Sequence, residues 1–181
     1  MPGRRRAAVP GAAPPVASRL GNEFGWRAHE AIQGWTASVD AKASIALVVQ
    51  TALAGAGAHA LIAGDGELHH ATGLRLVLAI AAVAFLVASV VCGLWVIFPR
   101  LHRRRRDPPA GLIYFGDLRD RDPDEIAATL GTLTPEQERA QLACQMRVTS
   151  RVAWRKHSWL QRSLGAFMIG AILLVLTYVT F

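Results

Sequence analysis

The acids between positions 117 and 125 are the first residues whose types and spacing could support chemistry. An EF-hand calcium site needs alternating acids, a central glycine and a closing glutamate at fixed offsets. The acids here lack those offsets, and two of them stand where helices begin. We therefore expect them to cap helices and to face solvent. They are Asp117, Asp120, Asp122, Asp124 and Glu125.

Histidines and cysteines give no metal site either. His69 and His70 lie together in a short polar stretch, where a metal would need further ligands. Cys92 lies in an apolar run and Cys144 in a polar one, with no CxxC spacing. The sequence contains no P-loop, GxGxxG, HExxH or GxSxG motif. We expect neither an enzyme nor a cofactor or metal.

A basic run occupies residues 100–106 of a chain with a net charge of +7. Such a run could bind nucleic acid if it lay on a soluble face. It directly follows a long uncharged stretch, however, which favours a stop and an anchor at lipid headgroups. We predict no nucleic-acid partner. The anchoring residues are Arg100, Arg103, Arg104, Arg105 and Arg106.

Three uncharged stretches cover residues 43–64, 76–99 and 163–181. A membrane-spanning helix needs about 20 mostly apolar residues, and each stretch meets that length. The first is the least apolar and contains Gln50, so we expect it to pack against protein rather than to face lipid all round.

Basic residues predict the orientation of these spans. Of the 20 Lys and Arg residues, only Arg75 borders the loop between the first two spans. The positive-inside rule then places the N-terminus and residues 100–162 in the cytoplasm, and the C-terminus outside. We expect the chain to cross its membrane several times.

The N-terminal part divides at residue 22. Residues 1–21 are rich in Pro, Gly, Ala and Arg, which is typical of a disordered tail. Residues 22–42 read as a cytoplasmic helix that runs into the first span. Ile32, Trp35 and Val39 form an apolar stripe on it.

Residues 100–162 read as a helical region. Asp122-Pro123 and Thr134-Pro135 each place a capping residue before a proline, with Glu or Gln three residues after the cap. The second helix can continue without a break into the last span. GLIYFGDL, before both, reads as an extended or turn segment. The predicted fold is an all-α integral membrane protein with three transmembrane helices. Its small cytoplasmic region combines the N-terminal helix with the segment between spans two and three.

These pieces together resemble a known family. A helix with Asn22, Trp35 and D-x-K-A-S at residues 40–44 runs into a first span. A second span ends in Pro99-Arg100 and is followed by IYFGD at 113–117. A polar helix carrying Lys156 then leads into the last span. Over residues 22–181 the chain resembles the Pycsar membrane effectors, the transmembrane effectors of the pyrimidine-cyclase antiphage system.

The resemblance implies an antiphage effector located in a bacterial inner membrane. A neighbouring cyclase would make cyclic UMP or cyclic CMP on infection, and the effector would respond by impairing the inner membrane, causing abortive infection. We expect membrane lipids and further copies of the chain, as a homo-oligomer, to be its other partners. A non-enzymatic membrane scaffold or anchor without a nucleotide ligand is the alternative.

A cyclic pyrimidine mononucleotide has a base that can stack and one negative charge. Tyr114 or Phe115 could stack the base. Asp117 could accept a hydrogen bond from the ribose or base, while Lys156 or Lys42 could pair with the phosphate. Asp40 and Lys42 could instead fix the position of this helix at the membrane edge.

Overall fold

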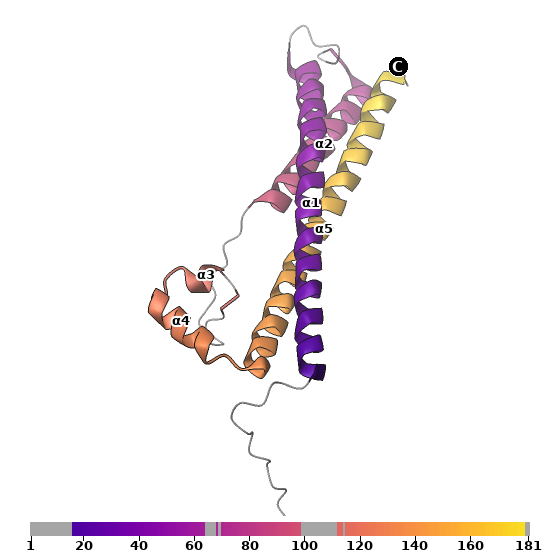
Figure 1. Ribbon diagram of the computed structural model, residues 1–181. Helices are drawn as coiled ribbons and strands as arrows, with labels where there is room; N and C mark the ends of the chain where they lie inside the picture. The colour runs from indigo at the N-terminus through magenta and orange to yellow at the C-terminus, as the bar shows by residue number, and fades with distance from the viewer. Residues whose placement is uncertain (1–15, 64–67, 69, 99–111, 114, 180–181) are drawn as a thin grey trace, which may run out of the picture. The chain divides into compact units, whose positions relative to one another are not determined.

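The computed structural model describes residues 16–63, 68, 70–98, 112–113 and 115–179 (Figure 1). The regular elements among them are all helices. The chain divides into two units. We call Gln33–Arg103 with Ser150–Phe181 the membrane unit, and Met1–Ile32 with Arg104–Thr149 the head unit. The helices are α1 (Val16–Ile62), α2 (Gly73–Ile97), α3 (Phe115–Leu118), α4 (Pro123–Gly131) and α5 (Pro135–Val179).

Three of these helices, α1, α2 and α5, are long and apolar enough to cross a membrane. Each exposes large apolar side chains, such as Val48, Val91 and Val175. Such an apolar exterior suits contact with lipid. The predicted all-α membrane fold with three spanning helices is confirmed.

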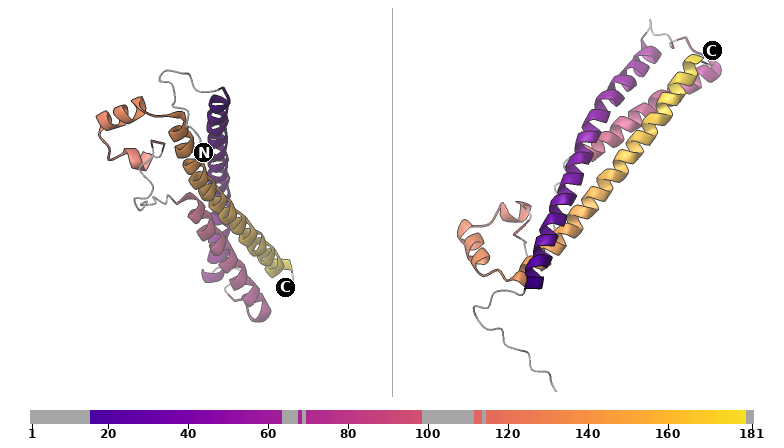
Figure 2. Two further views of the ribbon diagram at one scale, coloured as in Figure 1. Left: turned by 90° about the horizontal axis from the view of Figure 1, so that it is seen from below. Right: turned by 45° about the vertical axis from the view of Figure 1, so that its right-hand side comes forward.

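In the membrane unit, α1 and α5 run in the same direction and α2 runs against them (Figure 2). Asp40 and Gln50 of α1 bond to Lys156 and Ser163 of α5, so both helices advance together. A core of Val39, Ala43, Val96 and Leu160 closes one end. That end therefore contains the start of α1 within this unit and the final turn of α2.

Glycines allow the three helices of the membrane unit to approach closely. A Cβ on Gly170 of α5 would lie 3.0 Å from the backbone nitrogen of Leu86 in α2. A Cβ on Gly93 of α2 would lie 2.8 Å from a methyl carbon of Leu47 in α1. Because helix association in lipid depends on van der Waals packing, these positions require the smallest residue.

A seven-residue repeat explains which faces of α1 and α5 are covered. In each unit, the buried or half-buried positions of both helices recur at that interval, which is typical of coiled-coil packing. Most of the repeated residues are polar or small. They are Asn22, His29, Thr36, Ala43, Gln50 and Gly57 in α1, and Leu142, Thr149, Lys156, Ser163, Gly170 and Thr177 in α5.

Capping side chains start the two helices expected in the head unit. The Asp122 carboxylate accepts a hydrogen bond from Asp124 N–H at 2.9 Å, and Pro123 follows it as the first helical residue. Thr134 and Gln137 bond to each other's backbone N–H, at 3.3 and 2.9 Å. This reciprocal capping box confirms both predicted helix starts.

Three details differ from the sequence-based expectations. Helix α1 begins at Val16, directly after Pro15, rather than at Asn22. Residues 115–118 form one helical turn, α3, where an extended or turn segment was expected. Trp35 is 67% exposed, because the seven-residue repeat covers Thr36 and Val39 and leaves Trp35 beside the packed face.

Candidate functional site

A buried polar cluster joins α1 and α5 in the head unit. Asn22 Nδ2 donates to Glu138 Oε2 at 2.6 Å, and Trp26 Nε1 donates to Glu138 Oε1 at 2.8 Å. The His29 ring lies edge-on to Trp26, with 6.2 Å between centroids. Both oxygens of one carboxylate are thus used, and hydrogen bonds to a charged acceptor are the stronger kind.

The side-chain carbonyl of Asn22 remains unused. Asn22 is only 8% exposed, and its Oδ1 is buried without a hydrogen-bond partner. Its Nδ2 already reaches Glu138 and, at 3.5 Å, the carbonyl of Pro135. A buried acceptor left unsatisfied costs about 1–3 kcal/mol. The cluster therefore stabilises the head unit less than it would if every buried polar atom had a hydrogen-bond partner.

The segment that carries IYFGD is attached to the same stretch of α5. Gln141 Oε1 accepts a hydrogen bond from Leu112 N–H at 2.9 Å. Gln141 lies one helical turn beyond Glu138, and Gly116 and Asp117 are half-buried. The structure thus places Leu112, the residue directly before IYFGD, on the stretch of α5 that also carries Glu138.

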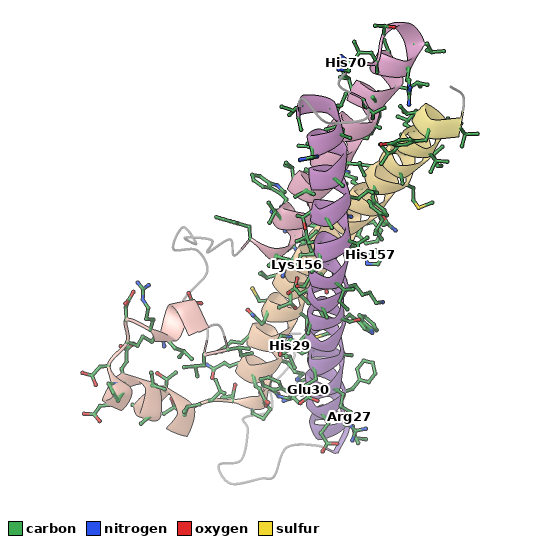
Figure 3. All side chains as sticks on the ribbon, turned by 90° about the horizontal axis from the view of Figure 1, so that it is seen from above. Arg27, His29, Glu30, His70, Lys156 and His157 are labelled. Atoms are coloured by element: carbon green, nitrogen blue, oxygen red, sulfur yellow. The ribbon has the colours of Figure 1, made fainter. Side chains whose placement is uncertain are left out.

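Lys156 of α5 reaches α1 in the membrane unit (Figure 3). Its Nζ lies 2.7 Å from each carboxylate oxygen of Asp40, and the two side chains are 24% and 37% exposed. Ser44 Oγ donates to the Asp40 carbonyl at 2.9 Å. A half-buried pair of this geometry holds α5 against α1 and neutralises the ammonium group.

Aromatic rings from α2 and α5 meet beside the core at this end of the membrane unit. Trp95 of α2 meets Trp159 of α5 edge-on, with 6.2 Å between centroids. The Arg162 guanidinium lies 4.9 Å from the Trp159 ring. Tryptophan beside arginine is typical of a membrane–water interface.

A second polar group lies deep in the membrane unit. Gln50 Nε2 donates to Ser163 Oγ at 3.0 Å, and Ser163 Oγ donates to the Ser89 carbonyl at 2.8 Å. All three residues are almost fully buried. The expectation that the first span packs against protein around Gln50 is confirmed. One hydrogen-bonded chain connects all three spanning helices.

The predicted ligand residues fall in different places. Asp117 is half-buried in α3, and its side chain or backbone has an interaction within the chain. Lys42 is exposed, whereas Lys156 is paired with Asp40. Phe115 begins α3. The anchoring residues Arg100, Arg103, Arg104, Arg105 and Arg106 lie outside the described residues, as does Tyr114.

Sequence reasoning missed several residues that the structure brings together. The seven-residue interval could have revealed some of them, because Gln50 and Ser163 belong to the repeats that also contain Asn22 and Lys156. No comparable signal indicates Trp26 and Glu138. They become partners only through the packing of α1 on α5.

Titratable side chains give little further indication of a site. Within the described ranges, no three His, Cys, Asp or Glu residues are grouped so that they could hold a metal ion.

In the exposed turn after α3, a hydrogen bond from Arg119 lowers the pKa of the Asp120 carboxyl and raises that of Arg119. Full exposure makes this a surface pair with little consequence for a site.

Comparison with known proteins connects this architecture to a family. A family model described as a Pycsar effector protein domain matches residues 24–181, which include all three spanning helices and the head-unit contacts of Trp26 and Glu138. No curated protein and no solved structure matches the chain. The chain belongs to the Pycsar effector family, a family of membrane effectors in antiviral defence.

Proposed function

We propose that this protein responds to cyclic UMP or cyclic CMP, made by a neighbouring cyclase, by impairing the bacterial inner membrane. The observation that carries the proposal is the family match over residues 24–181. The fold is consistent with it, because three spanning helices provide a means of acting on a bilayer. Family membership also suggests a non-catalytic effector.

The head unit is the part that we propose contacts the base. Its IYFGD segment is held on α5 by the bond between Gln141 and Leu112. Tyr114 or Phe115 would stack the pyrimidine, and Asp117 would accept a hydrogen bond from the ribose or base. The buried Asn22 carbonyl of the same unit lacks a donor and would be available as a further hydrogen-bond acceptor if the head unit rearranged.

Neither of the two lysines considered for the phosphate is assigned to this base site, because Lys42 and Lys156 both belong to the membrane unit. A phosphate needs a cation with free hydrogen-bonding capacity. Lys156 already donates to both oxygens of Asp40, so we assign it to the packing of α5 on α1. The exposed side chain of Lys42 carries no such pair among the described contacts.

The response would travel through α5, which contributes residues to both units. A nucleotide that binds one arrangement of the head unit better than another would shift the population toward it. Homo-oligomers in the inner membrane, with the N-terminus cytoplasmic and the C-terminus outside, would convert that shift into loss of membrane integrity.

Binding and leakage assays test the proposal separately. Purified protein in detergent is titrated with cyclic UMP, cyclic CMP, cyclic AMP and linear UMP by calorimetry. The same protein in dye-loaded liposomes is then exposed to each nucleotide. We expect one cyclic pyrimidine to bind and to release dye, and linear UMP to do neither. Correct insertion without binding of either cyclic pyrimidine would favour a ligand-free scaffold.

Matched variants test the residues. Phe115→Ala and Asp117→Asn should weaken nucleotide binding about tenfold or more, the loss expected when a stacking or charged contact worth about 1.5–3 kcal/mol is removed. Asp120→Asn provides the control, because Asp120 is an exposed acid three positions from Asp117. Unchanged binding by Phe115→Ala and Asp117→Asn would refute this assignment while leaving the nucleotide response intact.

A further inference from the structure

One exposed face of α1 has the spacing of a coiled-coil seam. Exposed positions recur every seven residues from Phe24, and a second exposed row begins three residues later. These rows lie away from the repeat that packs on α5. We call the ten residues the α1 seam. The first row is Phe24, Ala31, Ser38, Ile45 and Ala52, and the second is Arg27, Gly34, Ala41, Val48 and Gly55.

The α1 seam combines small residues with large apolar ones. Six of its ten positions are Gly, Ala or Ser, which permit another helix backbone to approach closely. Phe24, Ile45 and Val48 are 73%, 71% and 70% exposed, respectively. Small positions that alternate with large exposed side chains supply both the holes and the knobs of a helix–helix contact.

Two glycines of the seam have no use within the described chain. A Cβ on Gly34 or Gly55 would meet nothing within 4 Å, whereas Cβ atoms on Gly25 and Gly57 would press on neighbouring side chains. Glycine inside a helix costs about 1 kcal/mol relative to alanine. The same open space occurs off the seam at Gly21 and Gly165, so at Gly34 and Gly55 it permits the close approach of another helix without requiring one.

Phe24 adds an independent observation at the other end of the seam. Its ring is exposed between Glu23 and Arg27, which are exposed as well. These charges indicate aqueous surroundings, where lipid cannot cover the ring. A large exposed apolar side chain in line with a helix-packing motif is typical of a protein contact surface.

We propose that the α1 seam packs against the same face of a second copy of the chain. The seam runs along the sequence from the charge-bearing stretch at Phe24 into the apolar span at Ile45 and Ala52. A soluble partner cannot follow it into lipid. A second copy has both parts in the same order, and insertion in one orientation makes the two helices parallel.

Charge sets a condition on this pairing. Arg27 is the single charged residue in the two rows, so in a parallel pair in register the Arg27 side chains of the two copies face each other. Glu23 and Glu30, which directly precede Phe24 and Ala31 of the first row, are exposed acids that can offset this repulsion.

Disulfide cross-linking in native membranes tests this surface. In a Cys92→Ala, Cys144→Ala background, single variants Ala31→Cys, Ser38→Cys and Ile45→Cys are oxidised with copper phenanthroline. We expect disulfide-linked dimers at all three positions. Leu94→Cys and Val152→Cys are the controls, because both side chains are exposed on other helices. They should remain monomeric under the same conditions.

A second measurement separates a true interface from collision. Gly34→Leu combined with Gly55→Leu should reduce cross-linking at Ser38→Cys at least several-fold, while Gly165→Leu on α5, which also has open space, should not. Equal cross-linking at Leu94→Cys, or none on the α1 seam, would overturn the proposal. No nucleotide is added, so this outcome is independent of the proposed ligand response.

Discussion

The two units differ in how completely the polar groups between α1 and α5 are hydrogen-bonded. In the head unit one carboxylate, Glu138, receives both donors, and Asn22 keeps an unused carbonyl. In the membrane unit, Gln50 and Ser163 form a chain that ends on the backbone of α2. Glycines such as Gly170 also allow the helices of this unit to pack closely.

The two units therefore also differ in how many independent contacts hold α1 against α5. Close packing and polar contacts both restrain the membrane unit, so no single hydrogen bond should determine its geometry. The head unit also packs Gly25 against Leu142, but its buried Asn22 carbonyl is unsatisfied, and a region with fewer satisfied contacts opens at lower free energy. A ligand-driven change is therefore easier to begin in the head unit.

The largest effect should come from a single methyl group in the membrane unit. Gly170→Ala places a Cβ about 3 Å from backbone atoms of α2, which cannot rotate away. We expect a loss of about 1–3 kcal/mol in the free energy of unfolding, measured by denaturant titration in micelles. Gly165→Ala, where the Cβ meets nothing within 4 Å, should be neutral or stabilising. Similar losses in both variants would contradict the steric explanation.

The head unit should respond to loss of its central acceptor. Glu138→Leu leaves Trp26 Nε1 without its acceptor and leaves Asn22 Nδ2 only the 3.5 Å contact with the Pro135 carbonyl, at a cost of about 1–3 kcal/mol. Hydrogen exchange should accelerate in residues 20–32 and stay unchanged in α2. Glu136→Leu is the control, because Glu136 is exposed and pairs only with Arg139 among its described contacts. Faster exchange in α2 as well would show that the two units do not respond separately.

A smaller effect is expected when a buried hydrogen bond of the membrane unit is removed. Hydrogen bonds between helices in lipid contribute about 0.6 kcal/mol on average. Gln50→Leu should therefore change the free energy of unfolding by less than Gly170→Ala in the same titration. Thr51→Leu, at an exposed position that bonds only its own helix, is the control. A loss for Gln50→Leu larger than that for Gly170→Ala would mean that polar contacts contribute more than packing to the free energy of unfolding.

The smallest effect should come from the exposed pair after α3. Arg119 lowers the pKa of the Asp120 carboxyl, so any stabilisation exists above the ordinary carboxyl value of 3.8 and disappears as the pH falls below it. Because both groups are fully exposed, we expect Arg119→Ala to leave the melting temperature unchanged at neutral pH. A measurable decrease would mean that this turn carries more of the head unit's stability than its exposure suggests.

The spanning helices and helix starts could be predicted because each depends on local features. Apolar length identifies α2, and Asp122 and Thr134 cap the helices directly after them. The partner of Lys156 could not be predicted, because Asp40 lies 116 positions away and only the packing of α1 on α5 brings it close. Trp35 illustrates the same limit, since local spacing cannot decide which of two apolar faces is covered.

The buried glutamine has a consequence for how the protein is made. Gln50 precedes its partner Ser163 by 113 residues. At roughly 5–20 residues per second, a ribosome needs about 6–23 s to add that length. During this interval the Gln50 amide lacks the partner that α5 later provides. Helix α5 thus supplies the hydrogen-bond partner of Gln50 in α1 only after α1 and α2 have been synthesised. Truncation before Ser163 should leave the first span the least stably inserted.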